Sequence, residues 1–260
     1  MRKPTNQQIF DLINAIAPFE TQEDFDNAGF LIGSPHAEVD NILVALDATP
    51  AVVQEALDKG AQLLVVHHPL MFHAVKTLRQ DTYEGALLGQ ILRSGLSVIS
   101  AHTNLDQTYL SGGAVIGRKL GLNDLRKADP FIYLGELPQP ISARMLGTQI
   151  GEVLGQRLRC YGKPDVVIRT LAIAGGAYDE GYLAAREAGA QAYLTGEVRH
   201  HNALAAAESG FVLFDGEHYH TEVGMMHELA LYLQNTLNTL QYHVGVHASA
   251  AISGARGCTL

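Results

Sequence analysis

The sequence predicts an α/β protein made of two related βαβ-type lobes, each with a largely parallel sheet flanked by helices. Three observations support this fold class. Apolar runs typical of buried strands alternate with stretches of helical periodicity along the chain. The second half of the chain repeats the order of the first half. Histidines and carboxylates directly follow several of the apolar runs.

The first half of the chain alternates helices and strands. The segment 50–60 has the clearest boundaries, because Thr49 is a favourable N-cap residue, Pro50 fits the first turn and Gly60 ends the helix. The run 61–68 contains four consecutive aliphatic residues at 63–66, as expected of a strand buried on both faces. We expect helices over 4–18, 50–60 and 83–95, and strands over 41–48, 61–68 and 96–102.

The second half shows the same alternation and matches the first, without a gap, when Gly60 is aligned with Gly189. Residues 60–62 (GAQ) then fall on the identical residues 189–191, and the pair 67–68 falls on the pair 196–197. The expected elements are strands over 170–176, 190–197 and 211–218, and helices over 179–189, 202–210 and about 221–240.

We infer an N-terminal α/β lobe over 1–125 and a C-terminal α/β lobe over 126–260. The polar segment 122–130, which ends at Pro130, is the expected junction. The alternative is a chance similarity between helix-turn-strand units, which share small residues. Since no long linker separates the halves, we expect the two lobes to pack intimately. They could then be counted either as a single domain or as two.

Composition restricts the class of protein. The chain has 260 residues, 47% hydrophobic and 17% charged, with a formal net charge of −9. No apolar run approaches the ~18 residues of a membrane helix, and the N-terminus lacks the apolar region of a signal peptide. We therefore expect a cytoplasmic protein without membrane association, and the negative charge disfavours nucleic-acid binding. Cys160 and Cys258, the only cysteines, exclude a disulfide framework and a thiolate zinc site.

Five polar residues follow predicted strands at their carboxyl ends, where ligands bind in open α/β sheets. The expected metal ligands are His67, His68, Asp106, His218 and Glu222. Adjacent residues of a regular strand point to opposite faces, but the backbone is free to turn at a strand end, so neighbouring imidazoles can serve two ions. Five ligands also exceed the three that protein supplies to a catalytic mononuclear zinc. Both lobes are therefore expected to pack around one site with two divalent ions per chain.

The charge of such a site indicates which kind of substrate it would bind. Two divalent ions and two carboxylates leave a surplus near +2, which would hold an anionic substrate such as a phosphate and activate a water. Mixed imidazole and carboxylate ligands suit Zn, Mn, Fe, Ni or Co. An acidic protein could bind a nucleotide-like molecule in this way.

Two further residues are candidates for moving protons. His102 is a proton shuttle or a partner of a ligand, the alternative being a ring bonded to a backbone carbonyl. Glu197 is a general acid/base or a hydrogen-bond partner of a ligand histidine, the alternative being a carboxylate at a helix N-terminus. Asp26 and Asn27 either edge the pocket or form a turn. No site role is expected of His73, His200, His201, His243 and His247.

Four motifs resemble a known family. LLVVHHPLMF, SAHTNLD, LTGEVRHHNALAA and GEHYHTE are similar to segments of the NIF-three-like (YbgI-like) dinuclear-metal proteins, often labelled GTP cyclohydrolase I type II homologues. DNAGFLIG and ILVALDAT resemble the opening of that family, and the similarity extends from about residue 5 to 240. The resemblance implies a two-lobed α/β fold, the same five metal ligands, and a ring-shaped homohexamer whose sites face an inner cavity. The chain departs from the family pattern at His220, which would either add a ligand or disturb one. It also departs in 244–260, which lacks periodicity and is expected to be irregular or partly exposed.

Together these features predict a metal-dependent hydrolase acting on a nucleotide-like or other anionic substrate through a metal-activated water. GTP ring opening, phosphoester hydrolysis and amide hydrolysis would all suit the centre, with His102 or Glu197 moving protons. One alternative is a non-catalytic metal-binding oligomeric scaffold or regulatory interaction protein. Another is a single structural metal site, which would have closed four-coordinate geometry.

Overall fold

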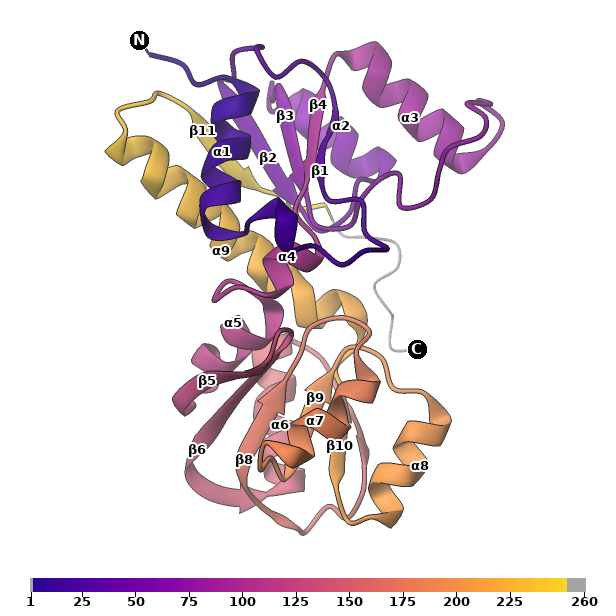
Figure 1. Ribbon diagram of the computed structural model, residues 1–260, viewed down its shortest axis with the longest axis vertical. Helices are drawn as coiled ribbons and strands as arrows, with labels where there is room; N and C mark the ends of the chain where they lie inside the picture. The colour runs from indigo at the N-terminus through magenta and orange to yellow at the C-terminus, as the bar shows by residue number, and fades with distance from the viewer. Residues whose placement is uncertain (1, 252–260) are drawn as a thin grey trace. The chain divides into compact units, whose positions relative to one another are not determined.

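The computed structural model describes residues 2–251, which form two compact units. The first unit contains the chain up to Thr108 together with the segment that starts at Met226, and the second is Tyr109–Met225. These limits differ from the predicted division at 125/126. Helix α9 (His218–Thr239) runs through the second change of unit (Figure 1), and the strand that follows it joins the sheet of the first unit.

The first unit contains a five-stranded sheet in the order β1-β4-β3-β2-β11. Strands β2, β3, β4 and β11 are parallel, and β1 pairs with β4 in the antiparallel direction. Every residue of β3 and β4 is buried, which explains the uninterrupted apolar run of β3. The strands are β1 (Gly29–Ile32), β2 (Asn41–Ala45), β3 (Leu63–Val66), β4 (Ser97–Ser100) and β11 (Gly245–Ala248).

Strand β11 corrects an expectation about the C-terminal segment. Residues 244–260 were expected to be irregular or partly exposed, and Gly245–Ala248 are partly exposed but regular, since they pair with β2 in the parallel direction. Pairing with a strand edge is a long-range interaction that leaves little periodicity in so short a strand. The carboxylate of Glu55 accepts hydrogen bonds from the following segment, from the Ser249 hydroxyl at 2.6 Å and the Ala250 amide at 3.1 Å. Cys258 and the rest of the predicted irregular segment lie outside the described residues.

Helices cover both faces of this sheet. The α2 and α3 side chains pack on one face in a cluster that includes Val53, Ile91 and Leu64, and Figure 1 shows α1 and α9 on the other face. The predicted N-cap of α2 is confirmed, since the Thr49 hydroxyl accepts a hydrogen bond from the Val52 amide at 3.2 Å. The helices are α1 (Asn6–Ile16), η1 (Phe19–Thr21), α2 (Pro50–Asp58), α3 (Tyr83–Ser94) and α4 (Thr103–Asp106).

The second unit contains a six-stranded sheet in the order β5-β6-β8-β9-β10-β7. Among its described strands, β8, β9 and β10 are parallel as predicted, whereas β5, β6 and β7 join them in antiparallel pairs. The expected junction at 122–130 is therefore mostly a strand, whose side chains are largely exposed and give no apolar run. The strands are β5 (Asn123–Asp129), β6 (Ile132–Ser142), β7 (Arg159–Tyr161), β8 (Val167–Ile173), β9 (Ala192–Thr195) and β10 (Val212–Asp215).

The second sheet is also covered on both faces. Ile116 of α5 and Ile150 of α6 belong to the core cluster on one face, and Ala185 of α7 and Ala206 of α8 to the cluster on the other. The helices are α5 (Gly112–Lys119), α6 (Ala143–Leu154), η2 (Asp179–Gly181), α7 (Tyr182–Glu187) and α8 (His200–Glu208), followed by the first turns of α9.

The strand register supports the predicted internal repeat. Ile42 pairs with Leu63 in the first sheet, and the residues aligned with them in the repeat, Leu171 and Ala192, pair in the second. In each sheet the third parallel strand, β4 or β10, carries an antiparallel neighbour, β1 or β7. The two related lobes are thus each centred on three parallel strands whose carboxyl ends lie at one edge.

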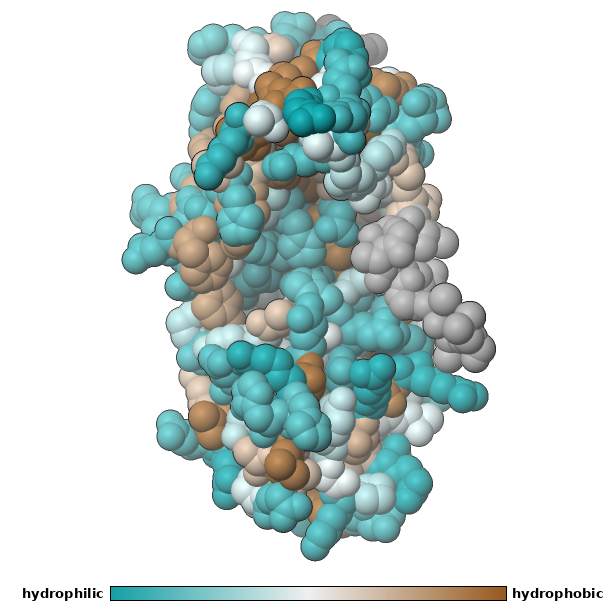
Figure 2. Space-filling view, turned by 90° about the vertical axis from the view of Figure 1, so that its right-hand side faces the viewer, coloured by the Kyte–Doolittle hydropathy of each residue, from teal (hydrophilic) through white to brown (hydrophobic). Residues whose placement is uncertain are grey.

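The surface carries no extended apolar face in the view of Figure 2, where hydrophobic residues are scattered among hydrophilic ones. Within residues 2–251, no helix combines the length and the hydropathy that crossing a membrane requires.

Candidate metal centre

Three histidines gather at the carboxyl ends of β3 and β4. His67 and His68 directly follow Val66, and His102 precedes the short helix α4. One ring nitrogen from each histidine lies within 4.8 Å of the others. The ring centroids of His67 and His68 are 4.9 Å apart, and those of His67 and His102 are also 4.9 Å apart. This group, with Asp106, is called the first half-site.

His67 is fully buried, and its ring has a defined orientation. Its Nδ1 lies 2.8 Å from the carbonyl oxygen of Ala101, so Nδ1 carries the proton and donates it. The lone pair is then on Nε2, which lies 3.6 Å from Oδ1 of Asp106. Asp106 is held in place by α4, because its amide donates to the carbonyl of His102 at 3.1 Å.

His68 is oriented by Asp47, which follows β2. Its Nδ1 lies 2.7 Å from Oδ1 of Asp47, which again places the lone pair on Nε2. The amides of His67 and His68 both donate to the carbonyl of Leu46, at 3.2 and 3.1 Å. Successive amides of a regular strand point in opposite directions, so the backbone has turned at this position. This turn places a ring nitrogen of each of the two imidazoles in the same group of histidines.

His102 forms a dyad with Asp26. The ring Nδ1 lies 2.8 Å from Oδ1 of Asp26, and the other carboxylate oxygen accepts hydrogen bonds from the Thr103 amide, at 3.1 Å, and from the Thr103 hydroxyl. Burial of the Asp26 carboxyl would raise its pKa, but the hydrogen bonds with His102 and Thr103 outweigh this effect and lower the pKa to about 2. His102 is therefore bonded to a carboxylate rather than to a backbone carbonyl.

The second half-site lies at the carboxyl ends of β9 and β10 in the second unit, and consists of His218, Glu222 and Glu197. His218 begins α9, and Glu222 stands one turn further on. Nε2 of His218 lies 3.0 Å from Oε2 of Glu222, which is buried. Nδ1 of His218 lies 2.7 Å from Oε1 of Glu197. Glu197 is thus a hydrogen-bond partner of His218, and the N-cap of α8 is Arg199 rather than Glu197.

Gly176 makes room for Glu222. Its φ is +62°, and a Cβ at this position would stand 2.2 Å from Oε1 of Glu222. The amide of Gly176 donates to the Thr221 hydroxyl at 3.1 Å, which attaches the end of β8 to the first turn of α9. In the alignment of the two halves, Gly176 falls on Asp47. The equivalent position after the first parallel strand therefore contacts a predicted ligand in each half, His68 in the first and Glu222 in the second.

An ion-pair network holds the segment that carries Glu197. The Asp179 carboxylate accepts hydrogen bonds from the Arg199 amide at 2.9 Å, from the Arg199 guanidinium at 2.8 Å and from Asn202 at 2.8 Å. Burial would raise the pKa of Asp179, but the bonds from Arg199 and Asn202 prevail and lower the pKa to about 2. The loop between β9 and α8 is thereby fixed to η2.

Several other predicted positions lie away from these groups. His220 is buried, with Nδ1 3.2 Å from the carbonyl oxygen of Leu154, and among the described residues it belongs to none of the candidate metal-binding groups. His73 is exposed and packs edge-on against Phe72. His200 and His201 form the exposed first turn of α8.

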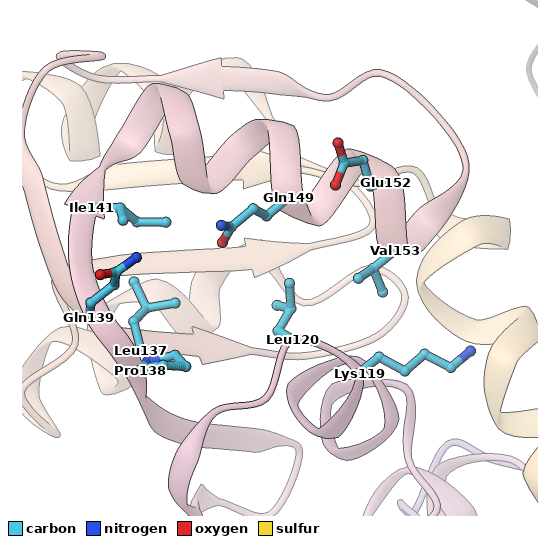
Figure 3. A pocket seen from close by; sticks show the side chains of 9 residues that line it. All are labelled: Lys119, Leu120, Leu137, Pro138, Gln139, Ile141, Gln149, Glu152 and Val153. Atoms are coloured by element: carbon cyan, nitrogen blue, oxygen red, sulfur yellow. The ribbon is translucent and has the colours of Figure 1, made fainter.

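A pocket of about 410 Å³ opens between α5, β6 and α6 in the second unit (Figure 3). Its lining mixes apolar side chains such as Leu137 and Val153 with Lys119 and Glu152. No predicted site residue lines it. The pocket therefore does not coincide with either half-site.

The donor set of both half-sites fits a divalent transition metal. Four histidines, His67, His68, His102 and His218, share one arrangement in which Nδ1 bonds to a backbone or carboxylate oxygen, so that Nε2 is the nitrogen left to face an ion. Metal-binding histidines almost always have their second nitrogen fixed in this way. Asp47 was missed from sequence, and the only available signal was its position after a strand.

The chain is similar to proteins of known sequence and structure. It is 30% identical over 264 residues to a GTP cyclohydrolase 1 type 2 homolog of Streptomyces coelicolor, covering 96% of this chain and 93% of that protein. It is also 30% identical over 245 residues to the GTP cyclohydrolase 1 type 2 of Helicobacter pylori strain J99, covering 92% and 94%.

Solved structures show the same fold. The Staphylococcus aureus hypothetical protein SA1388 matches with a TM-score of 0.93 at 25% identity, covering 99% of this chain and 100% of that one. A Bacillus cereus protein related to NIF3 matches with a TM-score of 0.94 at 18% identity, covering 100% of both chains. A family model described as Duf34/NIF3 (NGG1p interacting factor 3) matches residues 4–253. The resemblance stated from the sequence is confirmed, and the chain belongs to the Duf34/NIF3 family.

Proposed function

We propose that this protein is a metal-dependent hydrolase in which the two half-sites together hold two divalent ions. The ligands in this proposal are His67, His68 and Asp106 from the first half-site and His218 and Glu222 from the second. One observation carries the proposal: histidines in both units have Nδ1 fixed by an acceptor, so that Nε2 is the donor atom. The combination of imidazole and carboxylate donors suits Zn, Mn, Fe, Ni or Co.

The chain's own residues would orient the ligands before any ion binds. The Ala101 carbonyl and Asp47 fix the rings of His67 and His68, while Glu197 fixes His218. Preorganised ligands lose little conformational freedom on binding, which raises affinity. When bound, the ions would supply Lewis acidity and a water of lowered pKa.

His102 would move the proton in the hydrolytic reaction. Its Nδ1 donates to Asp26, which fixes the tautomer and places the accepting lone pair on Nε2. The Asp26 carboxylate would stabilise the imidazolium that forms when Nε2 takes a proton, as the acidic member of a catalytic triad does. Glu197 serves mainly to position His218, and its exposed carboxylate would exchange protons with solvent.

An anionic, nucleotide-like molecule is the substrate class that we propose. The surplus positive charge of two ions over two ligand carboxylates would attract phosphate oxygens. The names of relatives in Streptomyces coelicolor and Helicobacter pylori, which refer to GTP cyclohydrolase 1 type 2, support testing GTP first. We further propose that the protein works as a ring-shaped homohexamer in the cytoplasm.

Turnover of GTP and of a phosphoester panel tests the proposal. We expect hydrolysis by the purified protein to stop after chelation and to return when a divalent metal is added. His102→Gln should lower turnover by ~10²-fold or more without changing metal content, whereas His243→Gln, at an exposed histidine outside both half-sites, should change neither. Full metal content without turnover on any substrate would favour a non-catalytic scaffold. Loss of metal from His102→Gln would assign His102 to the ligand set instead.

A further inference from the structure

We propose that Phe25 and Phe72 form an aromatic wall beside the first half-site, on which the planar heteroaromatic ring of the substrate stacks. This inference rests on the proposed function and adds to it the residues that recognise the substrate. The two phenylalanines lie in different loops, before β1 and after β3, and come together at 6.2 Å between ring centroids.

Both rings are exposed although phenylalanine is strongly hydrophobic. Phe25 is 64% exposed and Phe72 is 40% exposed. A second phenylalanine pair in the same unit behaves differently, since Phe10 and Phe19 stack at 4.2 Å with an interplanar angle of 8° and Phe19 is buried. The Phe25 and Phe72 rings are tilted by 57°, so they are not stacked face to face. Exposed apolar groups that gather in this way mark binding surfaces.

Hydrogen bonds hold the two loops in place. The side-chain amide of Asn27 donates to the carbonyl of Met71 at 2.7 Å, which joins the loop of Phe25 to the loop of Phe72. The Ala28 amide donates to the side chain of Gln22 at 2.8 Å and closes the first loop on itself. The rings are therefore presented by anchored backbone, and this arrangement lowers the entropy lost when a ligand binds.

The aromatic wall is continuous with the histidine group. The Phe72 ring meets the His102 ring edge-on, with centroids 6.1 Å apart and an interplanar angle of 87°. His102 is itself among the three histidines whose ring nitrogens lie within 4.8 Å of one another. A ligand bound at this group would therefore lie next to the Phe72 ring, as in small-molecule sites that combine apolar walls with a few polar groups.

A heteroaromatic ring fits this combination better than an aliphatic group does. Aromatic side chains bind planar bases through their faces with little dependence on base identity, while the anionic part of the same molecule would face the ions of the proposed centre. The chemistry of the wall and of the half-site thus matches the two ends of a nucleotide. A second copy of the chain could cover the wall instead of a nucleotide base, and the following experiment distinguishes these two alternatives.

Calorimetric titration of the metal-loaded full chain with GMP and with ribose 5-phosphate tests the inference. The two probes carry the same sugar phosphate, and only GMP has a base. We expect wild type to bind GMP at least ten-fold more tightly than ribose 5-phosphate. The double variant Phe25→Ala/Phe72→Ala should lose this preference while binding ribose 5-phosphate as wild type does. Tyr83→Ala, at an aromatic residue that is 66% exposed on α3, should keep the preference, as should Phe72→Tyr.

The inference would be overturned if wild type does not prefer GMP, which includes binding neither probe, or if the preference survives in the double variant. It would also be overturned if the double variant differs from wild type in its mass in analytical ultracentrifugation instead, because this would assign the wall to an interface between copies. Failure of the proposed function would show differently, as missing ions or missing turnover, because the titration measures base preference and not hydrolysis.

Discussion

Gly176→Ala tests whether the end of β8 determines the position of Glu222. The backbone at Gly176 has φ +62°, where an L-residue costs ~1–2 kcal/mol. Gly60 is a matched control, since its φ is +61° and a Cβ there would have nothing within 4 Å. We expect Gly60→Ala to lower the free energy of unfolding by ~1–2 kcal/mol through backbone strain alone. Gly176→Ala should lower it by more, because its Cβ would stand 2.2 Å from Oε1 of Glu222.

The two variants should also differ in metal binding. Displacing the Glu222 carboxylate would remove or misplace a proposed ligand, which should cost at least the ~10–100-fold in metal affinity that is typical of losing a ligand's hydrogen-bond partner. Competition with a chromogenic chelator measures that affinity, and urea unfolding at one pH measures stability. Equal metal affinities for Gly176→Ala and Gly60→Ala would refute the reasoning, as would equal losses of stability.

Two further variants test neighbouring interactions. Asp47→Ala removes the acceptor that fixes His68 at 2.7 Å and should weaken metal binding by ~10–100-fold in the same chelator assay; unchanged affinity would show that the His68 ring needs no such partner. Asp179→Asn should lower the free energy of unfolding at pH 7 by ~2 kcal/mol, because the Asp179 pKa of about 2 lies below the ordinary value of 3.8. That stabilisation is complete above pH 3.8 and disappears as pH falls through about 2. In denaturant titrations across this range, wild type should therefore lose this part of its stability, whereas Asp179→Asn should show no such loss.

Strand ends were predictable because their signals are local. A buried aliphatic run that stops at His67 and His68 indicates both a core strand and a polar edge. The alignment of the two halves predicted equivalent strands, and the register of β2 with β3 and of β8 with β9 supports it. The parallel core of each lobe could therefore be derived from the sequence.

The remaining elements depend on long-range pairing. Strand β5 is largely exposed and charged, so it has no apolar run, and it is defined by antiparallel bonding to β6. Strands β2 and β11 stand near opposite ends of the sequence, yet the two pair directly. The contacts of Asp47 with His68 and of Asp26 with His102 span 21 and 76 residues. No local pattern encodes such partners, which is why Asp47 was missed, whereas Glu197 was a candidate partner because it follows a predicted strand.

The central claim is that one chain binds two divalent ions through both half-sites. Elemental mass spectrometry of the untagged protein measures this directly, with wild type compared to His67→Ala and Glu222→Ala and with His73→Ala as an exposed control. We predict two ions per chain for wild type and for His73→Ala, and a loss in each of the other two variants. One ion or none in wild type, or unchanged content in both His67→Ala and Glu222→Ala, would contradict the account.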